Sequence, residues 1–267
     1  MAETLEQAAP IRLDGRGIVI LGAGGGGIGT IAARILAAAG ARLLCVDISD
    51  EQAKAVAQQV GGEAYVADIT DRQQMEKLFA HAVNLFGDSF YGVADIVGYS
   101  PGGAMEDNND EVIERTFNLN FRHAFLTVQI AAPILAKCGG GSLVFVSSLS
   151  GSRATPNQGT YSVAKGALEQ LIRQAAFEYG GRGVRVNGVA PGLTMTPGVR
   201  KAIDDRVAAD IAATIPMNKL ATAQDQANSI YFLLSDLAAH VSGTIIHVDG
   251  AQMTQAGLPE LSGGRTR

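Results

Sequence analysis

Short apolar runs alternate with longer segments of helical periodicity along most of the chain. The apolar runs are rich in branched residues, which is typical of buried parallel strands, and they span residues 17–21, 41–46, 64–67, 94–97, 142–146, 184–189 and 244–248. Between them, apolar residues at helical spacing predict helices over residues 30–39, 50–60, 71–86, 111–136, 161–179 and 224–234. The alternation predicts an α/β fold in three layers, with a doubly wound parallel sheet between two layers of helices.

The chain contains no internal repeat and no linker that would divide it. With 267 residues and 47% hydrophobic content it fills one sizeable core, so we expect a single domain with its core over about residues 12–252. Residues 1–10 and 255–267 are expected to be mobile tails. Residues 193–217 mix apolar residues with a charged cluster and are expected to form a lid; the cluster is Arg200, Lys201, Asp204, Asp205 and Arg206.

Charge and composition narrow the classes of partner. The formal net charge of −5 and the absence of any Lys or Arg run argue against nucleic acid. No stretch reaches the length of a membrane span, and residues 1–10 lack the apolar core of a signal peptide, so we expect a cytoplasmic protein. Two isolated cysteines and four separated histidines predict neither a disulfide framework nor a metal site. Small molecules and other copies of the chain remain as partners.

A glycine-rich stretch, residues 22–29, lies between the first strand and the first helix. Glycines there let the backbone approach a pyrophosphate, whose charge then lies at the helix N-terminus. Asp47 ends the second strand 20 residues beyond Gly27, where a carboxylate accepts hydrogen bonds from the adenosine ribose and repels a 2′-phosphate. The alternative is a glycine-rich turn that serves only close packing.

Tyr161 is the one tyrosine of six with a lysine, Lys165, four residues later. On a helix the two side chains share a face. A phenol with a reference pKa of ~10 transfers protons poorly near neutral pH unless its anion is stabilised. We expect the lysine and the positive end of the helix to lower the pKa of Tyr161. The alternative is a half-buried tyrosine beside a snorkelling lysine.

Together, the glycine loop, Asp47, Asp68, Ser148, Tyr161, Lys165 and the pair Pro191 and Gly192 resemble the short-chain dehydrogenase/reductase family, from about Gly15 to about Gly250. The resemblance implies a Rossmann-type fold and a nicotinamide cofactor. It also implies that Ser148, 13 residues before Tyr161, binds the substrate oxygen while Tyr161 transfers the proton. Lys165 is implied to hold the nicotinamide ribose, and Asn120 to anchor a water that relays the proton.

The resemblance further implies which residues surround the cofactor. Thr194 resembles the residue that contacts the carboxamide, and Met195 is expected beside the substrate, with Val199, Ile203 and Met217 in a partly apolar pocket or packing the lid. The implied cofactor-binding residues are Gly22, Gly27, Ile28, Gly29, Asp47, Ile48, Asp68, Ile69, Tyr99, Tyr161, Lys165, Pro191, Gly192 and Thr194. Because of Asp47, NAD is expected over NADP.

The chain departs from the family pattern in two places. The glycine loop has Leu21 where the family has threonine, and it contains one extra residue between Gly22 and Gly27. After the fourth strand, Tyr99, Ser100 and Pro101 replace the family's Asn-Asn-Ala, so two side-chain amides are lost. We expect Ser100 and Pro101 to replace these amides structurally, and Tyr99 to form part of the wall beside the cofactor.

These features predict an NAD(H)-dependent oxidoreductase that interconverts a secondary alcohol and a ketone. A reductase of 3-oxoacyl thioesters, with the same active-site residues, and a catalytically silent nucleotide-binding scaffold are the alternatives. A homo-oligomer, expected to be a tetramer, is implied by the family. It also follows from apolar residues that exceed what one side of a sheet needs, namely Phe121, Phe125, Val128, Ala132, Leu168, Ile172 and Phe177.

Overall fold

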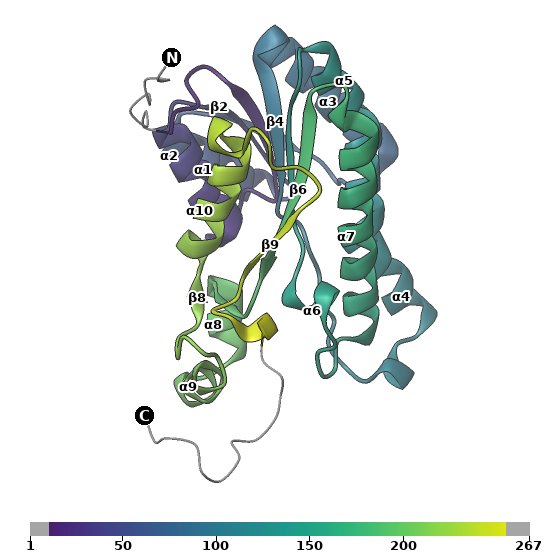
Figure 1. Cartoon of the computed structure of the whole chain (residues 1–267), viewed down its shortest axis with the longest axis vertical. Coiled ribbons are helices and arrows are strands. Elements are labelled where there is room, and N and C mark those ends of the chain that lie inside the picture. Colours follow the sequence, from purple (N-terminus) through teal and green to yellow (C-terminus); the bar gives the residue numbers. More distant parts are fainter. Residues whose placement is uncertain (1–10, 255–267) are drawn as a thin grey trace, which may run out of the picture.

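A seven-stranded parallel sheet forms the centre of the computed structural model, which describes residues 11–254. The strands lie in the order β3-β2-β1-β4-β5-β6-β9 (Figure 1). Their bounds are β1 Gly17–Leu21, β2 Arg42–Asp47, β3 Glu63–Val66, β4 Phe90–Asp95, β5 Gly141–Val146, β6 Val184–Pro191 and β9 Ile245–Val248. A separate short parallel pair joins β7, Thr194–Met195, to β8, Ala221–Thr222. The tails expected at residues 1–10 and 255–267 lie outside the described residues.

Helices cover both faces of the sheet, which confirms the predicted three-layer α/β fold (Figure 1). One layer contains α1 Ile28–Ala38, α2 Asp50–Val60 and α10 Ala223–Leu234. The opposite layer contains α3 Arg72–Phe86, α4 Asp110–Phe117, α5 His123–Lys137 and α7 Gly159–Gly180. Three short helices lie beyond the carboxyl ends of the strands: α6 Leu149–Ser152, α8 Pro197–Ala202 and α9 Asp205–Ala213.

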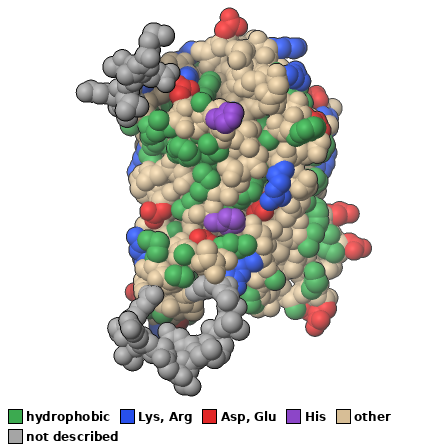
Figure 2. All heavy atoms as spheres, viewed as in Figure 1, with side chains coloured by type: hydrophobic (Ala, Val, Ile, Leu, Met, Phe, Trp, Pro, Cys, Tyr) green, Lys and Arg blue, Asp and Glu red, His purple; other side chains and the backbone are tan. Residues whose placement is uncertain are grey.

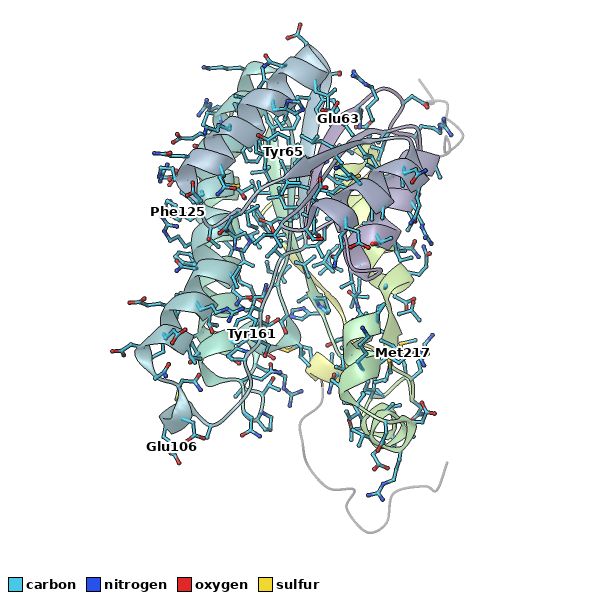
Figure 3. The ribbon with its side chains drawn as sticks, turned by 180° about the vertical axis from the view of Figure 1, so that it is seen from behind. Glu63, Tyr65, Glu106, Phe125, Tyr161 and Met217 are labelled. Carbon is cyan, nitrogen blue, oxygen red and sulfur yellow. The ribbon has the colours of Figure 1, made fainter. Side chains whose placement is uncertain are left out.

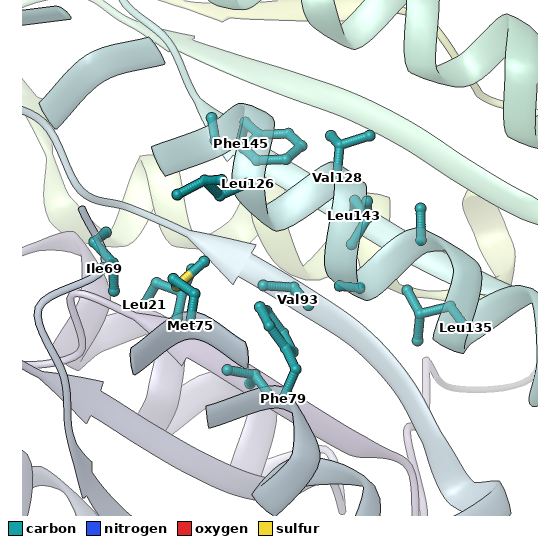
Figure 4. Packing of buried hydrophobic residues seen from close by; sticks show 14 of the residues in the cluster. Leu21, Ile69, Met75, Phe79, Val93, Leu126, Val128, Leu135, Leu143 and Phe145 are labelled. Carbon is teal, nitrogen blue, oxygen red and sulfur yellow. The ribbon is translucent and has the colours of Figure 1, made fainter. Parts of the chain in front are cut away.

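Successive side chains of β1 point to opposite faces of the sheet and pack into two separate core clusters. Ile18 and Ile20 belong to the cluster on the α1 and α10 side. Val19 and Leu21 belong to the opposite cluster, where Leu21 lies near Met75 of α3 (Figure 4). Both sets are fully buried, as expected for a strand inside a parallel sheet.

Two elements differ from the sequence prediction. β4 begins at Phe90, four residues before the predicted run, because Phe90 already pairs with Gly17 at the start of β1. The helix predicted over residues 111–136 is divided into α4 and α5 by a π-helical turn, Asn118–Arg122. There the Asn120 side chain donates to the Thr116 carbonyl at 2.8 Å, and such competition with the backbone disturbs a regular helix.

Most of the apolar residues expected to be in surplus on α5 and α7 are used within the chain. The exception is an exposed group that includes Phe125 and Phe177. Val128, Ala132, Leu168 and Ile172 are instead buried in the core cluster beneath these helices, because each faces the sheet.

The view in Figure 2 shows hydrophobic side chains in small groups among polar ones, with Lys and Arg scattered rather than gathered on that face. No helix within residues 11–254 is both long and apolar enough to cross a membrane.

Candidate active site

A cleft of about 630 Å³ opens beyond the carboxyl ends of the central strands. Figure 3 shows Tyr161 on the inner side of α7, whereas Phe125 lies on the outer side of the same layer. Of the predicted site residues, the cleft brings together Ile28, Tyr99, Ser148, Tyr161, Lys165, Pro191, Gly192 and Thr194. The segment predicted to be a lid contributes further lining residues, Leu193, Thr196, Val199 and Ile211. Met195 lies in β7 and is not among the residues that line this cleft.

Ser148 and Tyr161 meet because the chain turns sharply after β5. Ser148 caps α6, accepting a hydrogen bond from the Ser150 amide at 3.2 Å, and Tyr161 lies in the first turn of α7. Burial raises the pKa of Tyr161, and a hydrogen bond with Ser148 partly opposes that rise. The expected lowering of the Tyr161 pKa is therefore wrong.

Lys165 explains this difference. Its Nζ donates to the Val146 carbonyl at 2.7 Å and lies 5.8 Å from the centroid of the Tyr161 ring, so the ammonium is engaged elsewhere. The side chain is fully enclosed, with the residue 1% exposed. Burial lowers the pKa of Lys165 to about 8, while the negative charge of Asp95 acts in the opposite direction.

A buried carboxylate–imidazole pair near Lys165, Asp95 and His123, was missed by sequence reasoning. Asp95, the last residue of β4, has an oxygen 3.1 Å from Nε2 of His123, and Thr127 donates to its other oxygen at 3.4 Å. All three residues are buried. The available indication was a carboxylate within an apolar run, because a buried carboxylate requires partners. Those partners come from α5, which the strand pattern does not identify.

Asn120 holds the loop that follows β4. Its Oδ1 accepts from the Tyr99 amide at 3.1 Å, and its Nδ2 donates to the Tyr99 carbonyl at 2.7 Å. Asn120 therefore provides hydrogen bonds to the Tyr99 N–H and carbonyl, in the loop where the two side-chain amides of the family pattern are missing. Ser100 was predicted to do so and is instead exposed, with no hydrogen bond from its hydroxyl within residues 11–254. Tyr99 borders the cleft, and the guanidinium of Arg115 lies 4.6 Å from its ring centroid.

The glycine loop packs closely against the end of β1 and adopts backbone angles that favour glycine. A Cβ on Gly29 would lie 2.0 Å from the Gly22 carbonyl oxygen, so the first turn of α1 approaches the end of β1 as only glycine permits. Gly25 and Gly26 both have positive φ, at 76° and 69°. The Gly24 amide donates to Asp47 Oδ2 at 3.0 Å, and the Gly26 amide donates to the Thr30 hydroxyl at 3.1 Å.

A second, more apolar cleft of about 210 Å³ lies on the other side of this loop. It brings together five of the predicted residues: Gly22, Asp47, Ile48, Asp68 and Ile69. The apolar side chains suit a planar base, and the carboxylates of Asp47 and Asp68 suit ribose hydroxyl donors.

The two clefts and the loop fit a dinucleotide. Gly22 borders the second cleft and Ile28 the first, so the loop and the N-terminus of α1 lie between them. A Cβ on Gly27 would meet no atom closer than 3.7 Å, which leaves room for a phosphate against the backbone. Among the described residues that line the two clefts, Lys165 is the one cation.

Thr194, just beyond β6, is held by two partners. Its hydroxyl donates to the Gly192 carbonyl at 3.0 Å and accepts from Nε2 of Gln226 at 3.1 Å. Gln226 is buried in α10, and sequence reasoning missed it. The available indication was a glutamine at helical spacing with Ile230 and Leu233, on the face that packs inward.

Comparisons with known proteins agree with this architecture. A protein-family model described as "Enoyl-(Acyl carrier protein) reductase" matches residues 22–251. The chain is 34% identical over 260 residues to 7alpha-hydroxysteroid dehydrogenase of Escherichia coli (strain K12), covering 94% of this chain and 98% of that protein.

Two solved structures are similar throughout. One is a 7alpha-hydroxysteroid dehydrogenase complexed with NADH and 7-oxo glycochenodeoxycholic acid, with a TM-score of 0.83 and 33% identity, covering 90% of this chain and 94% of that one. The other is levodione reductase, with a TM-score of 0.86 and 30% identity, covering 91% of this chain and 99% of that one.

Proposed function

The chain belongs to the short-chain dehydrogenase/reductase family, and from this premise we propose that it is an NAD(H)-dependent oxidoreductase interconverting a secondary alcohol and a ketone. The observation that carries the proposal is the presence of Ser148, Tyr161 and Lys165 in one cleft with Thr194. A hydroxyl donor, a proton-transfer group and a cation then surround the place where a substrate oxygen would bind.

Each residue has a distinct task in the proposed reaction. Ser148 donates a hydrogen bond to the substrate oxygen, and Tyr161 gives that oxygen a proton during reduction or removes it during oxidation. A nicotinamide held in this cleft would supply or accept the hydride. Lys165 is proposed to hold the nicotinamide ribose. Its ammonium donates to the Val146 carbonyl and lies 5.8 Å from the centroid of the Tyr161 ring, so burial still favours the neutral phenol. Asn120 holds Tyr99 against the cleft, and we propose that it also anchors a water that carries the proton to bulk.

We propose NAD rather than NADP as the preferred cofactor. Asp47 presents a carboxylate in the second cleft, and no lysine or arginine lines that cleft among the described residues. A carboxylate beside a 2′-phosphate costs binding free energy, and each ~1.4 kcal/mol corresponds to about tenfold in affinity. Equal catalytic efficiency with NADPH and NADH would contradict this assignment.

Relatives indicate which substrates to try first. The solved dehydrogenase complex contains a 7-oxo steroid acid, and levodione reductase is named for a diketone. The cleft of this chain combines Leu193, Val199 and Ile211 with hydroxyl and amide groups, as an oxygenated apolar ring requires. We therefore propose cyclic secondary alcohols and ketones as the first substrate class.

A thioester reductase remains the second candidate, because the matching family model is described by an acyl-carrier-protein substrate. A silent scaffold is the third, although Ser148, Tyr161 and Lys165 are all present in the cleft.

One experiment separates these candidates. Hydride transfer is followed by absorbance of the reduced nicotinamide, with NAD(H) and NADP(H), across cyclic ketones, their alcohols, and 3-oxoacyl and enoyl thioesters. We expect turnover with ketones and NADH. Turnover confined to thioesters would favour the second candidate. NADH binding without any turnover would favour the scaffold.

A further inference from the structure

Gln226 has a hydrogen-bonding arrangement that its own packing does not explain. The residue is 0% exposed, and its Nε2 donates both to Thr194 Oγ1 at 3.1 Å and to the Val248 carbonyl at 2.9 Å. Its Oε1 is buried and has no hydrogen-bond partner among residues 11–254. A buried polar atom without a partner destabilises the fold, so a hydrophobic side chain here would avoid that cost.

The two groups that accept hydrogen bonds from Gln226 each have another hydrogen-bond partner. The Val248 carbonyl also accepts from the Gly192 amide at 3.2 Å. The Thr194 hydroxyl can still donate to the Gly192 carbonyl at 3.0 Å, but without the Gln226 amide it is free to rotate and donate to another acceptor instead. Removal of the glutamine amide would leave neither group without a hydrogen bond. A purely structural role therefore does not account for a glutamine at this position.

Its orientation is fixed by the Val248 carbonyl. A carbonyl oxygen only accepts, so the amide group facing Val248 must be the NH2 group, and the same NH2 group faces Thr194. A hydroxyl has one hydrogen and two lone pairs. In Thr194 the hydrogen is directed to Gly192 and one lone pair is occupied by Gln226, so the remaining site is a lone pair.

From this network we propose that Gln226 is a positioning residue that fixes Thr194 as a hydrogen-bond acceptor toward the cleft. The matching ligand group is an amide NH2, which the nicotinamide carboxamide supplies. The inference rests on the proposed function, since it requires a nicotinamide beside Thr194. Gln226 does not line the cleft, so it acts on the ligand through Thr194.

The test compares ligands that differ in the donor. NADH and its reduced thionicotinamide analogue both carry the NH2 group, whereas the reduced 3-acetylpyridine analogue has a methyl group in its place. Dissociation constants are measured by isothermal titration calorimetry. Wild type should bind the 3-acetylpyridine analogue about fivefold to tenfold more weakly than NADH, as expected for the loss of one hydrogen bond. It should bind the thionicotinamide analogue about as well as NADH.

The decisive variant is Gln226→Leu. It should reduce the preference for NADH over the 3-acetylpyridine analogue to about twofold or less. Its melting temperature should equal or exceed that of wild type, because the unpartnered Oε1 is removed. Thr194→Val should also abolish the preference. Gln224→Leu, on the exposed face of the same helix, should change neither quantity.

Two outcomes would overturn the inference: a Gln226→Leu protein that keeps the wild-type preference, or one that unfolds or loses affinity for all three ligands equally. Failure of wild type to bind NADH would instead contradict the proposed function, so the two failures are distinguishable.

Discussion

The Tyr161 hydroxyl lies in a buried position where its neutral form is favoured, with Ser148 as its hydrogen-bond partner. We predict that Tyr161→Phe, which removes only this hydroxyl, lowers turnover roughly 100- to 10,000-fold, the usual contribution of a general acid or base. NADH affinity should survive in calorimetry, because the ring remains. Tyr179→Phe, which removes a hydroxyl near the other end of α7, is the matched control and should keep full turnover. Near-normal turnover of Tyr161→Phe would refute the assigned role.

Lys165 provides a prediction about pH and stability. Its pKa of about 8 in the folded chain lies below the ordinary value of 10.5, so the unfolded chain binds more protons between these limits. The free energy of unfolding should therefore rise with pH from about 8 to 10.5, by about 3 kcal/mol at most. Below pH 8 both states are protonated, and the full cost of burying the ammonium is present.

Urea denaturation of the ligand-free chain at several pH values, beside Lys165→Met, isolates this effect from other titrating groups. Lys165→Met should be the more stable protein at pH 7, and its advantage should shrink as the pH approaches 10.5. Parallel pH profiles for the two proteins would show that Lys165 is not buried as a cation.

The positions of some site residues could be predicted from the sequence, whereas their contacts with distant residues could not. Ser148, Tyr161 and Lys165 were predictable because their spacing places them at one strand end and on one helix face. The contact of Asp95 with His123 was not, since it joins residues 28 positions apart on different elements. The orientation of the Lys165 ammonium toward Val146 depends on packing around the whole side chain, which spacing does not describe.

At the scale of elements, two glycines of the glycine loop are expected to serve different purposes, Gly29 for stability and Gly27 for cofactor binding. A Cβ on Gly29 would lie 2.0 Å from a backbone oxygen, and backbone cannot move aside cheaply. We predict that Gly29→Ala lowers the free energy of unfolding by about 3 kcal/mol or more, measured by urea denaturation. Gly27→Ala places its methyl 3.7 Å from Thr196, an ordinary contact, and should leave stability nearly unchanged.

The same Gly27 methyl would occupy the space proposed for the phosphate, so this variant should bind NADH about tenfold more weakly, equivalent to ~1.4 kcal/mol. The two variants form a matched pair within one loop. Equal loss of stability in both, or unchanged NADH affinity in Gly27→Ala, would contradict the proposed place of the pyrophosphate.

Strands and helices with strong periodicity were predictable, and β1 and α2 have the predicted bounds. The start of β4 was not, because its first half contains Tyr91 and Gly92 and lacks the branched run. The π-helical turn between α4 and α5 lies where the Asn120 side chain bonds both to the Thr116 carbonyl and to a loop 21 residues away, and helical periodicity alone indicates neither contact.

At the scale of the molecule, apolar side chains remain exposed on the outer helices. Phe125 on α5 is 42% exposed, Val163 on α7 is 53% exposed, and Phe177 on α7 is 85% exposed. Figure 3 shows Phe125 on the side of its layer away from the sheet. Exposed phenylalanines at this level favour burial against another protein surface. We therefore propose that α5 and α7 pack against other copies of the chain, as the family resemblance implies for a tetramer.

Light scattering at micromolar concentration tests this proposal. Wild type should have the mass of a tetramer, and Phe177→Glu should shift it toward a smaller species. Full burial of a phenylalanine contributes roughly 1.5–3 kcal/mol per copy, and a buried carboxylate adds a further cost. Leu237→Glu is the control, because Leu237 is 59% exposed and belongs to the short helix Asp236–Ala238, which packs against α10. A monomeric wild type would contradict the proposal, and equal masses for wild type and Phe177→Glu would place the interface elsewhere.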